Sequence, residues 1–450
     1  MPVLRRDPDI PDKVLRERLK SLSEAEDEYW AFRGNSKRGH AHAFFQYPAM
    51  MVPQMQGALI RAVAEARPAL TSAFDPFVGS GTTLTESMLQ GLRFTGWDIN
   101  PLAALLCFAK SGPFYPGALK QKLEELMRRV SADRSTLLET RLENVTKWFH
   151  RQVSVQLSRL RRAIRDEPAR WARCFFWVAL ADAVRLSSNS RTSTFKLHIR
   201  PQEELVTKRL SPVELFKEAA ERNISHLQTQ HEMLKERGLV EKGRYRKEIE
   251  IKLWDATKPT PRSSVAAGHD LLISSPPYGD NKSTVPYGQY SYLPLSWIDG
   301  TDIMDNWDEG WLKTTHEIDT RSLGGVLQGD AEAAASLRAL SQAFAVIEKA
   351  LEPFPRDRLK RVTAFCTDLN RSLGPVLSQL REGAYLIWTV GNRHVGGARV
   401  PLDAILSDLL MARGCQRVAD ISRPILLKRM AVKNSISDTM RTESVLVFRK

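Results

Sequence analysis

The chain is poor in cysteine, with four in 450 residues, and it has no long apolar run. Cys107, Cys174, Cys366 and Cys415 lie far apart, without a CxxC pair. This spacing suggests neither a disulfide framework nor a zinc knuckle. No window approaches the roughly 20 apolar residues of a membrane span, and the start, MPVLRRDPDIPDK, has no apolar signal region. We therefore expect a cytoplasmic protein with no metal site and no membrane partner.

Acidic residues are in the minority. The chain has 66 Lys and Arg against 52 Asp and Glu, which gives a formal charge of +14. A basic surplus of this size favours a polyanionic partner such as a nucleic acid over an acidic small molecule.

The pattern of apolar residues divides the chain into four parts. Residues 1–39 are a charged, partly helical arm, and residues 40–114 alternate strands with helices, as in a parallel α/β sheet. Residues 115–245 contain long charge-rich helical stretches, the first expected over 116–145, so we expect a mostly helical insertion. The α/β pattern resumes over 246–450. The simplest architecture is one doubly wound sheet whose two halves are separated by the insertion.

A glycine loop follows the first strand of this pattern, in DPFVGSGTT. The glycines allow a tight turn and close backbone approach before a helix begins. Thr82 and Thr83 follow Gly81, so the lysine of a P-loop is missing. Leu84 stands at the third glycine position of a GxGxxG fingerprint. The loop therefore fits neither of these two phosphate-binding motifs.

The most informative segment is DLLISSPPYGDN, residues 270–281, an apolar strand that runs into Ser275-Pro276-Pro277-Tyr278. Two prolines cannot continue a helix or donate to a central strand, so they end the strand in a rigid, narrow turn. The turn offers a hydroxyl and backbone carbonyls as acceptors for an amino group, and a tyrosine ring as a flat surface for a heterocycle. This chemistry suits the binding of a nucleobase.

The turn resembles the catalytic motif (Asp/Asn/Ser)-Pro-Pro-(Tyr/Phe) of the S-adenosylmethionine-dependent methyltransferases that modify exocyclic amino groups of DNA bases. Phe77-x-Gly79-x-Gly81 resembles the motif with which these enzymes wrap the methionine end of the cofactor. The resemblance implies a Rossmann-like sheet, S-adenosyl-L-methionine as cofactor and double-stranded DNA as substrate. It leaves open a cognate restriction endonuclease or other defence-system proteins as partners.

The resemblance also implies a set of cofactor-binding residues: Tyr47, Pro48, Asp75, Phe77, Gly79, Gly81, Thr82, Asp98, Ile99 and Asp255. In this interpretation Asp75 accepts from the cofactor's ammonium group, Asp98 from both ribose hydroxyls, and Asp255 faces the adenine amino group. A single aspartate at a strand end is more commonly a helix cap or a turn residue. Three at consecutive strand ends fit the sheet edge at which open α/β sheets bind ligands.

By the same resemblance, Ser275, Pro276, Pro277 and Tyr278 form the catalytic turn. The Ser275 hydroxyl and the Pro276 carbonyl are expected to accept from the target amino group, and Tyr278 to stack on a base swung out of the duplex. The amino nitrogen then attacks the methyl group directly and in line. No cysteine follows a proline in a strand-end turn, which argues against attack on a ring carbon.

Serine at the first motif position favours cytosine N4 as the target in this family, whereas Asp or Asn is typical of adenine N6. Adenine N6 stays open. An RNA guanine-N2 methyltransferase and a non-catalytic nucleic-acid-binding protein on the same scaffold are less favoured alternatives, since the chain has no recognisable RNA-binding module and keeps both motifs.

The order of the motifs matches the class whose target-recognition region lies between the cofactor and catalytic halves, which places that region in the insertion. Two groups of polar residues stand out there. Arg185, Ser188, Asn189, Arg191 and Lys196 are expected to contact DNA, because Arg and Asn read base edges and small hydroxyls suit phosphates. Arg159, Arg161, Arg162 and Arg165 mark a basic helix that a solvated face explains nearly as well.

Two further segments are left with simple interpretations. His40 and His42 are expected in a solvated loop, since no second pair of ligands stands near them. Tyr287, Tyr290 and Tyr292 fit equally well a mobile loop that closes over the base and tyrosines packed beneath a loop.

Overall fold

The computed structural model describes residues 9–25, 29–32, 39–207, 210–261, 268–327, 331–425 and 442–450. Parts of the expected N-terminal arm, residues 1–8, 26–28 and 33–38, lie outside the described residues. Among the described helices, none combines the length and the apolar character that crossing a membrane requires.

The core of the protein is a seven-stranded sheet in the order β10-β11-β7-β6-β1-β2-β5. Five neighbouring strands are parallel: β1 (Ser72–Asp75), β2 (Arg93–Asp98), β5 (Ile249–Leu253), β6 (His269–Ser274) and β7 (Leu380–Gly391). At one edge β11 (Thr442–Arg449) runs antiparallel to both β7 and β10 (Gln416–Pro424). The doubly wound α/β sheet expected from the sequence is therefore confirmed.

The direction of winding reverses between β1 and β6. The chain moves outward from β1 to β2 and β5, then returns to pair β6 on the other side of β1 and continues to β7. At such a switch point the loops that follow the two central strands diverge, which leaves a crevice at the carboxyl ends of the strands. The loop after β1 is the glycine loop, and the loop after β6 is the Ser-Pro-Pro-Tyr turn.

Alternate residues of a strand point to opposite faces of the sheet, and here each face is buried against its own core. Leu271 and Ile273 of β6 belong to one core with α2 (Pro53–Ala66), α3 (Thr82–Leu89) and α4 (Pro101–Lys110). Leu272 belongs to a second core, on the other face. That core is covered by α13 (Ala331–Leu340), α14 (Gln342–Leu351), α15 (Arg356–Ser378) and α16 (Leu402–Met411). Near-continuous apolar strands are what a sheet covered on both faces requires.

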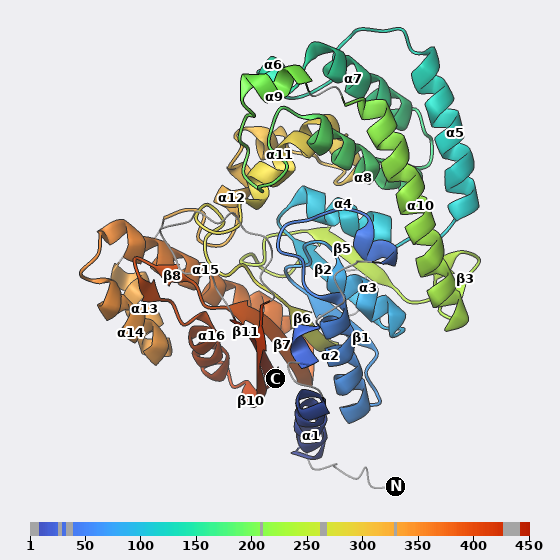
Figure 1. Ribbon diagram of the computed structural model, residues 1–450. Helices are drawn as coiled ribbons and strands as arrows, with labels where there is room; N and C mark the ends of the chain where they lie inside the picture. Colours follow the sequence, from blue (N-terminus) through green and yellow to red (C-terminus); the bar gives the residue numbers. More distant parts are fainter. Residues whose placement is uncertain are drawn as a thin grey trace.

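A layer of helices lies beyond α4, shown in green and cyan at the top of Figure 1. Its members are α5 (Pro116–Ala132), α6 (Val145–Trp148), α7 (Arg151–Arg165), α8 (Arg170–Ser187), α9 (Gln202–Thr207) and α10 (Pro212–Glu236). A short hairpin, β3 (Val240–Glu241) and β4 (Arg244–Tyr245), leads back to β5. The helix expected over 116–145 was too long: α5 ends at Ala132, and residues 133–142 are not helical.

The chain after the Ser-Pro-Pro-Tyr turn enters this layer. Helix α11 (Tyr287–Trp297) packs against α8, and it is followed by short turns and by α12 (Glu317–Arg321). Figure 1 shows α11 and α12 between the helical layer and the sheet. The segment that carries the three tyrosines is thus largely a helix, and Tyr290 is buried, as the packed alternative predicts.

The N-terminal arm is docked on the sheet. Leu15 and Leu19 of α1 (Asp9–Ala25) are buried, and the helix packs against α2 and β10. Asp12, also buried, accepts a hydrogen bond from the Tyr385 hydroxyl at 2.7 Å and pairs with Arg449 at 3.1 Å. Helix α1 therefore caps the side of the sheet formed by β7, β10 and β11, at the bottom of Figure 1.

Candidate active site

An open cavity of about 830 Å³ lies at the switch point of the sheet. Segments that are distant in sequence contribute to its wall, among them residues 47–51 before α2, the glycine loop after β1, the ends of β2 and β5, and the turn after β6. Eight residues named from the sequence line it: Tyr47, Pro48, Phe77, Gly79, Thr82, Asp98, Ile99 and Asp255. Ser275 and Pro277 line the same cavity.

The glycine loop is held open toward the cavity by the carboxylate of Asp98. Its Oδ2 accepts from the Gly79 backbone nitrogen at 2.8 Å, and its Oδ1 accepts from the Asn100 nitrogen at 2.8 Å. Gly79 and Gly81 have φ values of +50° and +75°, which side chains rarely adopt, and Gly81 caps the start of α3. Burial raises the pKa of Asp98 to about 6, against the effect of its backbone hydrogen bonds.

Asp75 lies behind this wall and is not among the residues that line the cavity. Its Oδ1 accepts from the Phe77 nitrogen at 3.0 Å and from the Ser274 hydroxyl at 2.6 Å. Burial raises the pKa of Asp75 to about 7. In this structure the side chain joins the end of β1 to the end of β6, and contact with a cofactor ammonium group stays a prediction. Gly81 also lies outside the cavity wall.

Ile99, Trp254 and Asp255, at the ends of β2 and β5, give this part of the cavity two apolar side chains and one carboxylate. Asp255 Oδ1 accepts from the nitrogen and the hydroxyl of Thr257, at 2.9 and 2.7 Å, which fixes the carboxylate at the edge of the cavity. An apolar slot with a fixed acceptor suits a planar heterocycle that carries an amino group.

The Ser-Pro-Pro-Tyr turn faces the cavity with Ser275 and Pro277, while Pro276 and Tyr278 are not part of its lining. The Ser275 hydroxyl lies 3.3 Å from the Tyr278 hydroxyl, which in turn donates to Glu443 at 3.0 Å. Burial, followed by the neighbouring Glu443 carboxylate, raises the pKa of Tyr278 well above its usual value, so its hydroxyl stays protonated. The Tyr278 ring packs against the second core, and stacking on a base stays a prediction.

The chain after the turn is anchored by an ion pair. Arg393 pairs with the buried Asp280 at 3.3 Å and donates to the Ser283 hydroxyl at 2.7 Å. A Cβ on Gly279 would meet the Arg393 guanidinium at 2.3 Å, so only glycine lets the backbone pass so close. This contact fixes the path by which the turn leaves the cavity.

The residues expected to contact DNA divide into two groups. Three have partners within the protein: the Arg185 guanidinium lies 4.2 Å from the centre of the Tyr290 ring, Ser188 donates to the Arg185 carbonyl at 2.9 Å, and Asn189 donates to the Lys147 carbonyl at 3.1 Å. Arg191 and Lys196 are exposed. They belong to a loop, residues 189–200, whose arms pair through an isolated bridge between Ser190 and Ile199.

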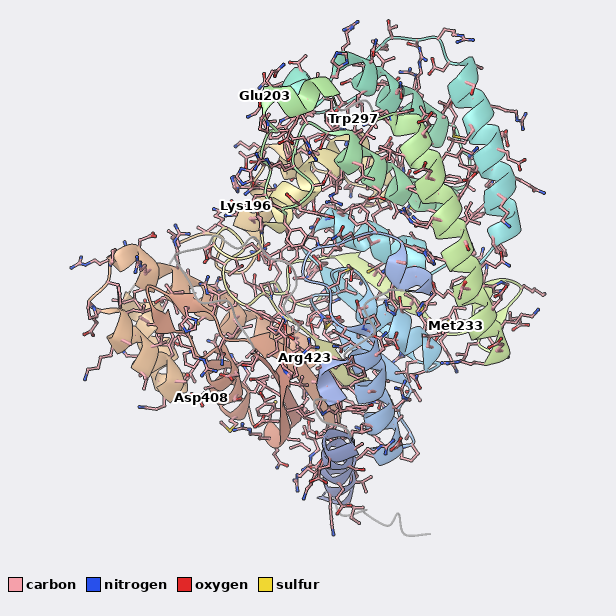
Figure 2. All side chains as sticks on the ribbon, in the orientation of Figure 1. Lys196, Glu203, Met233, Trp297, Asp408 and Arg423 are labelled. Carbon is pink, nitrogen blue, oxygen red and sulfur yellow. The ribbon has the colours of Figure 1, made fainter. Side chains whose placement is uncertain are left out.

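The 189–200 loop lies against α11, in the chain that follows the Ser-Pro-Pro-Tyr turn. The Leu197 nitrogen donates to Gln289 of α11 at 3.1 Å, and Phe195 contacts the Tyr290 ring edge-on. Figure 2 marks Lys196 between the helical layer and the sheet. The loop therefore extends from the insertion toward the part of the protein that carries the turn.

Of the four arginines of α7 singled out from the sequence, three have partners within the protein, and the fourth, Arg161, is buried. Arg162 pairs with Asp133 at 2.8 Å and Glu139 at 3.2 Å, and Arg165 pairs with Glu139 at 3.1 Å. Arg159 donates to the Ser135 carbonyl at 3.2 Å. Arg159, Arg162 and Arg165 thus contact the non-helical segment after α5. A solvated basic face is therefore the wrong description for most of this cluster.

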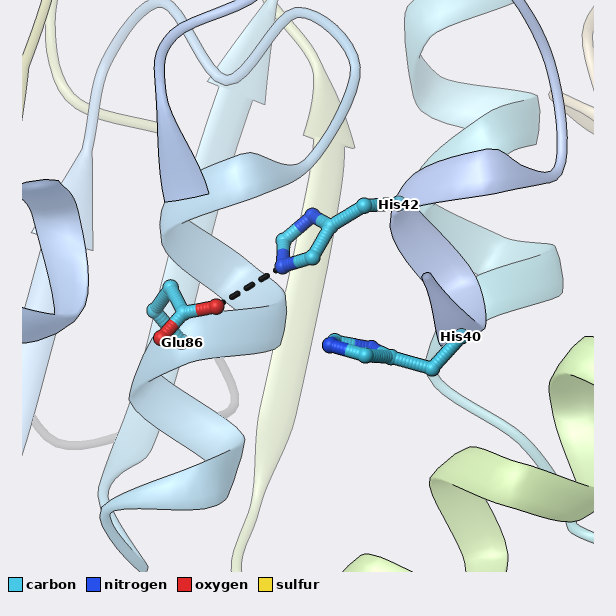
Figure 3. A group of neighbouring side chains, drawn as sticks. All are labelled: His40, His42 and Glu86. Atoms are coloured by element: carbon cyan, nitrogen blue, oxygen red, sulfur yellow. Dashed lines mark hydrogen bonds and ion pairs between the residues drawn. The ribbon is translucent and has the colours of Figure 1, made fainter. Parts of the chain in front are cut away.

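His40 and His42 are not in a solvated loop, which corrects the expectation from the sequence. His42 is 2% exposed, and its Nε2 lies 2.7 Å from Glu86 Oε1 of α3. Burial lowers the pKa of His40 to about 4 and raises that of Glu86 to about 7. Figure 3 shows the three side chains converging.

This group has the composition of a metal site, with ligand atoms within 4.8 Å of one another. A spacing of 2.7 Å is nevertheless that of a direct hydrogen bond, whereas two ligands on tetrahedral zinc lie roughly 3.3 Å apart. Arg61, Arg237 and Lys110 add positive charge around it. The cluster is best described as a polar contact that ties the segment before α2 to α3.

Sequence reasoning missed several residues of the cavity wall, among them Asn100, Trp254, Asn281 and Arg321. Asn100 Nδ2 donates to the hydroxyls of Tyr47 and Ser291, at 2.9 and 2.8 Å, and so joins the segment before α2 to α11. Asn100 directly precedes Pro101 and its side chain caps α4, so its place as a helix cap was readable from the sequence. The link to α11 was not.

The fold and the cavity define an α/β protein with an open cavity at the switch point of a doubly wound sheet and a Ser-Pro-Pro-Tyr turn at one wall. No protein-family model matches the chain. It is similar to the Type II methyltransferase M.MvaI of Kocuria varians, with 27% identity over 96% of this chain and 95% of that protein. A similarity that spans nearly the full length of both chains supports a methyltransferase.

A solved structure was also found, the rRNA methyltransferase AviRa from Streptomyces viridochromogenes, with 12% identity and a TM-score of 0.30. The match covers 92% of this chain and 90% of the AviRa chain. A TM-score of this size carries no argument about fold or function.

Proposed function

We propose that this protein is a DNA methyltransferase that transfers a methyl group from S-adenosyl-L-methionine to the exocyclic N4 of cytosine in a specific DNA sequence. The observation that carries the proposal is the shared cavity: Ser275 and Pro277 of the turn line the same space as Gly79, Asp98 and Ile99. A methyl donor and a target base must meet in one site for direct transfer. The similarity to a Type II methyltransferase supports DNA as the substrate.

The donor set of the cavity fits S-adenosylmethionine. Asp98 offers a carboxylate that uses one lone pair on each oxygen and keeps others for ribose hydroxyls. Ile99 and Trp254 give the adenine an apolar slot, with Asp255 beside it, and Tyr47 and Phe77 line the end near the glycine loop. When bound, this cofactor supplies an electrophilic methyl group on a positively charged sulfur.

The residues of the turn supply orientation. An amine on an aromatic ring is a weak nucleophile because its lone pair is delocalised, so the protein must hold the nitrogen in line with the methyl group. In the proposed mechanism the Ser275 hydroxyl and the Pro276 carbonyl accept the two amino hydrogens, and Pro277 limits the depth to which the base enters. The base reaches the turn only after leaving the stack, and Tyr278 is its stacking surface.

Cytosine N4 is preferred over adenine N6 because a serine stands at the first motif position. Adenine N6 is the principal alternative, since an acceptor pair serves either amino group. An RNA guanine-N2 methyltransferase and a non-catalytic nucleic-acid-binding protein are weaker candidates.

The proposal is tested by expressing the chain in a host without DNA methylation and sequencing the DNA by a method that separates N4-methylcytosine from N6-methyladenine. The expected result is N4-methylcytosine within one short sequence, and its loss in a Tyr278→Ala strain. N6-methyladenine would overturn the base preference, and unmodified DNA beside modified RNA would overturn the choice of substrate.

A further inference from the structure

We propose that Glu443 is a positioning residue for methyl transfer, which acts through Tyr278 to turn the lone pairs of Ser275 toward the target amino group. The inference rests on the proposed function. It adds a residue that is 165 positions from Tyr278 in sequence and belongs to no motif of the turn.

The geometry is a chain of three groups. Ser275 Oγ lies 3.3 Å from Tyr278 Oη, and Tyr278 Oη lies 3.0 Å from Glu443 Oε1. At the other end Glu443 Oε2 pairs with Arg423 Nε at 3.1 Å, and both side chains are largely buried, 16% and 7% exposed. Only the first member of the chain, Ser275, lines the cavity.

The direction of the hydrogen bonds follows from the chemistry of the last acceptor. An ionised carboxylate only accepts, so Tyr278 must donate its single proton to Glu443. Tyr278 can then only accept from Ser275, which must donate to it. The Ser275 proton therefore points away from the cavity, and its lone pairs remain available to the amino group of the base. If Tyr278 instead donated to Ser275, the Ser275 proton would be free to point into the cavity, where it would repel the amino hydrogens of the base.

The sheet explains why a residue so distant in sequence reaches the turn. β11 runs antiparallel to β7, so its first residues lie at the edge where the parallel strands end. Glu443 stands opposite Gly391 of β7 and opposite Arg423 of β10. The cross-strand ion pair with Arg423, which Figure 2 marks within the sheet, holds the carboxylate in place.

The test compares Glu443→Gln with Glu443→Asp in the full-length protein. In the Gln variant the Arg423 guanidinium selects the amide oxygen, which leaves the NH2 group toward Tyr278 and reverses the chain. We expect kcat on duplex DNA to fall roughly 10- to 100-fold, the cost of one mispaired hydrogen bond, with unchanged cofactor Kd. The Asp variant keeps the acceptor and should retain most of the activity that the Gln variant loses.

A double-mutant cycle with Tyr278→Phe separates positioning from a structural effect. If Glu443 acts through the Tyr278 hydroxyl, Glu443→Gln adds little to the loss already caused by Tyr278→Phe. The inference would be overturned if the losses in kcat from Glu443→Gln and Tyr278→Phe multiplied in the double variant, or if Glu443→Gln kept full activity. In either case, DNA methylation by the wild-type protein would still support the proposed function. A wild-type protein that methylates no amino group would overturn both.

Discussion

The cavity at the switch point and the helical layer use polar residues in different ways. At the cavity, most residues named from the sequence line one space and keep acceptor capacity for a ligand. In the helical layer, three arginines of the most conspicuous basic cluster, on α7, bind carboxylates or a carbonyl of the segment after α5. Residues at the ends of parallel strands are brought to one edge by the topology itself. A basic helix face has no such constraint, because its partners come from segments that the pattern does not reveal.

The largest effect is expected from substitutions in the Ser-Pro-Pro-Tyr turn. Pro277→Ala or Tyr278→Ala should lower the rate of methyl transfer to duplex DNA roughly a hundred-fold or more. The reason is that a small displacement of the reacting groups costs about that factor in rate. Cofactor binding should remain measurable by calorimetry, since Gly79, Asp98 and Ile99 are unchanged. Full activity of the Tyr278→Ala protein on duplex DNA would contradict the base-stacking role.

The next largest effect is expected at the proposed cofactor site. Asp98→Ala removes the acceptor for the Gly79 and Asn100 nitrogens, so cofactor affinity should fall roughly 10- to 100-fold. The same carboxylate predicts a pH dependence. Its pKa is raised to about 6 by burial, so the ionised acceptor is present above that pH and lost below it.

The cofactor Kd, measured by calorimetry, should therefore rise as the pH falls from 7.5 to 5.5. Asp98→Asn, which does not titrate, should bind more weakly at pH 7.5 and show a flatter profile. An equally steep profile in the Asn variant would assign the titration to another group.

The fold and part of the site were predictable for the same physical reason. Strand ends at Asp75, Asp98 and Ser275 could be read from apolar runs followed by glycine or proline, and parallel strands share one edge. Which side chains point into the cavity could not be read, because that depends on contacts between distant segments. Asp75 turns instead to Ser274, and Glu443 reaches Tyr278 from the antiparallel edge. His42 is buried because α3 brings Glu86 to it, 44 residues later.

Within the helical layer, the 189–200 loop is the part whose polar side chains are expected to bind a ligand, as those of the cavity do. Arg191 and Lys196 are exposed, and neither forms an ion pair within the described part of the chain. Replacing both with alanine should weaken DNA binding several-fold. It should also flatten the dependence of log K on log salt by about 0.9 for each DNA phosphate that the protein no longer neutralises. Fluorescence anisotropy over a range of salt concentrations measures both, and an unchanged slope would place DNA elsewhere.

The smallest effect on DNA is expected from Arg162→Ala, which removes the same positive charge as Arg191→Ala and so serves as its matched control. Arg162 holds Asp133, Glu139 and the Leu137 carbonyl, all in the segment after α5. Its loss should lower the free energy of unfolding by roughly 1–3 kcal/mol, toward the lower end because the pairs are partly solvated, as measured in urea. DNA affinity and its salt dependence should stay within about two-fold of wild type. If Arg162→Ala instead weakened DNA binding as much as Arg191→Ala while leaving stability unchanged, the basic face of α7 would bind phosphate, and the contrast between the two regions would fail.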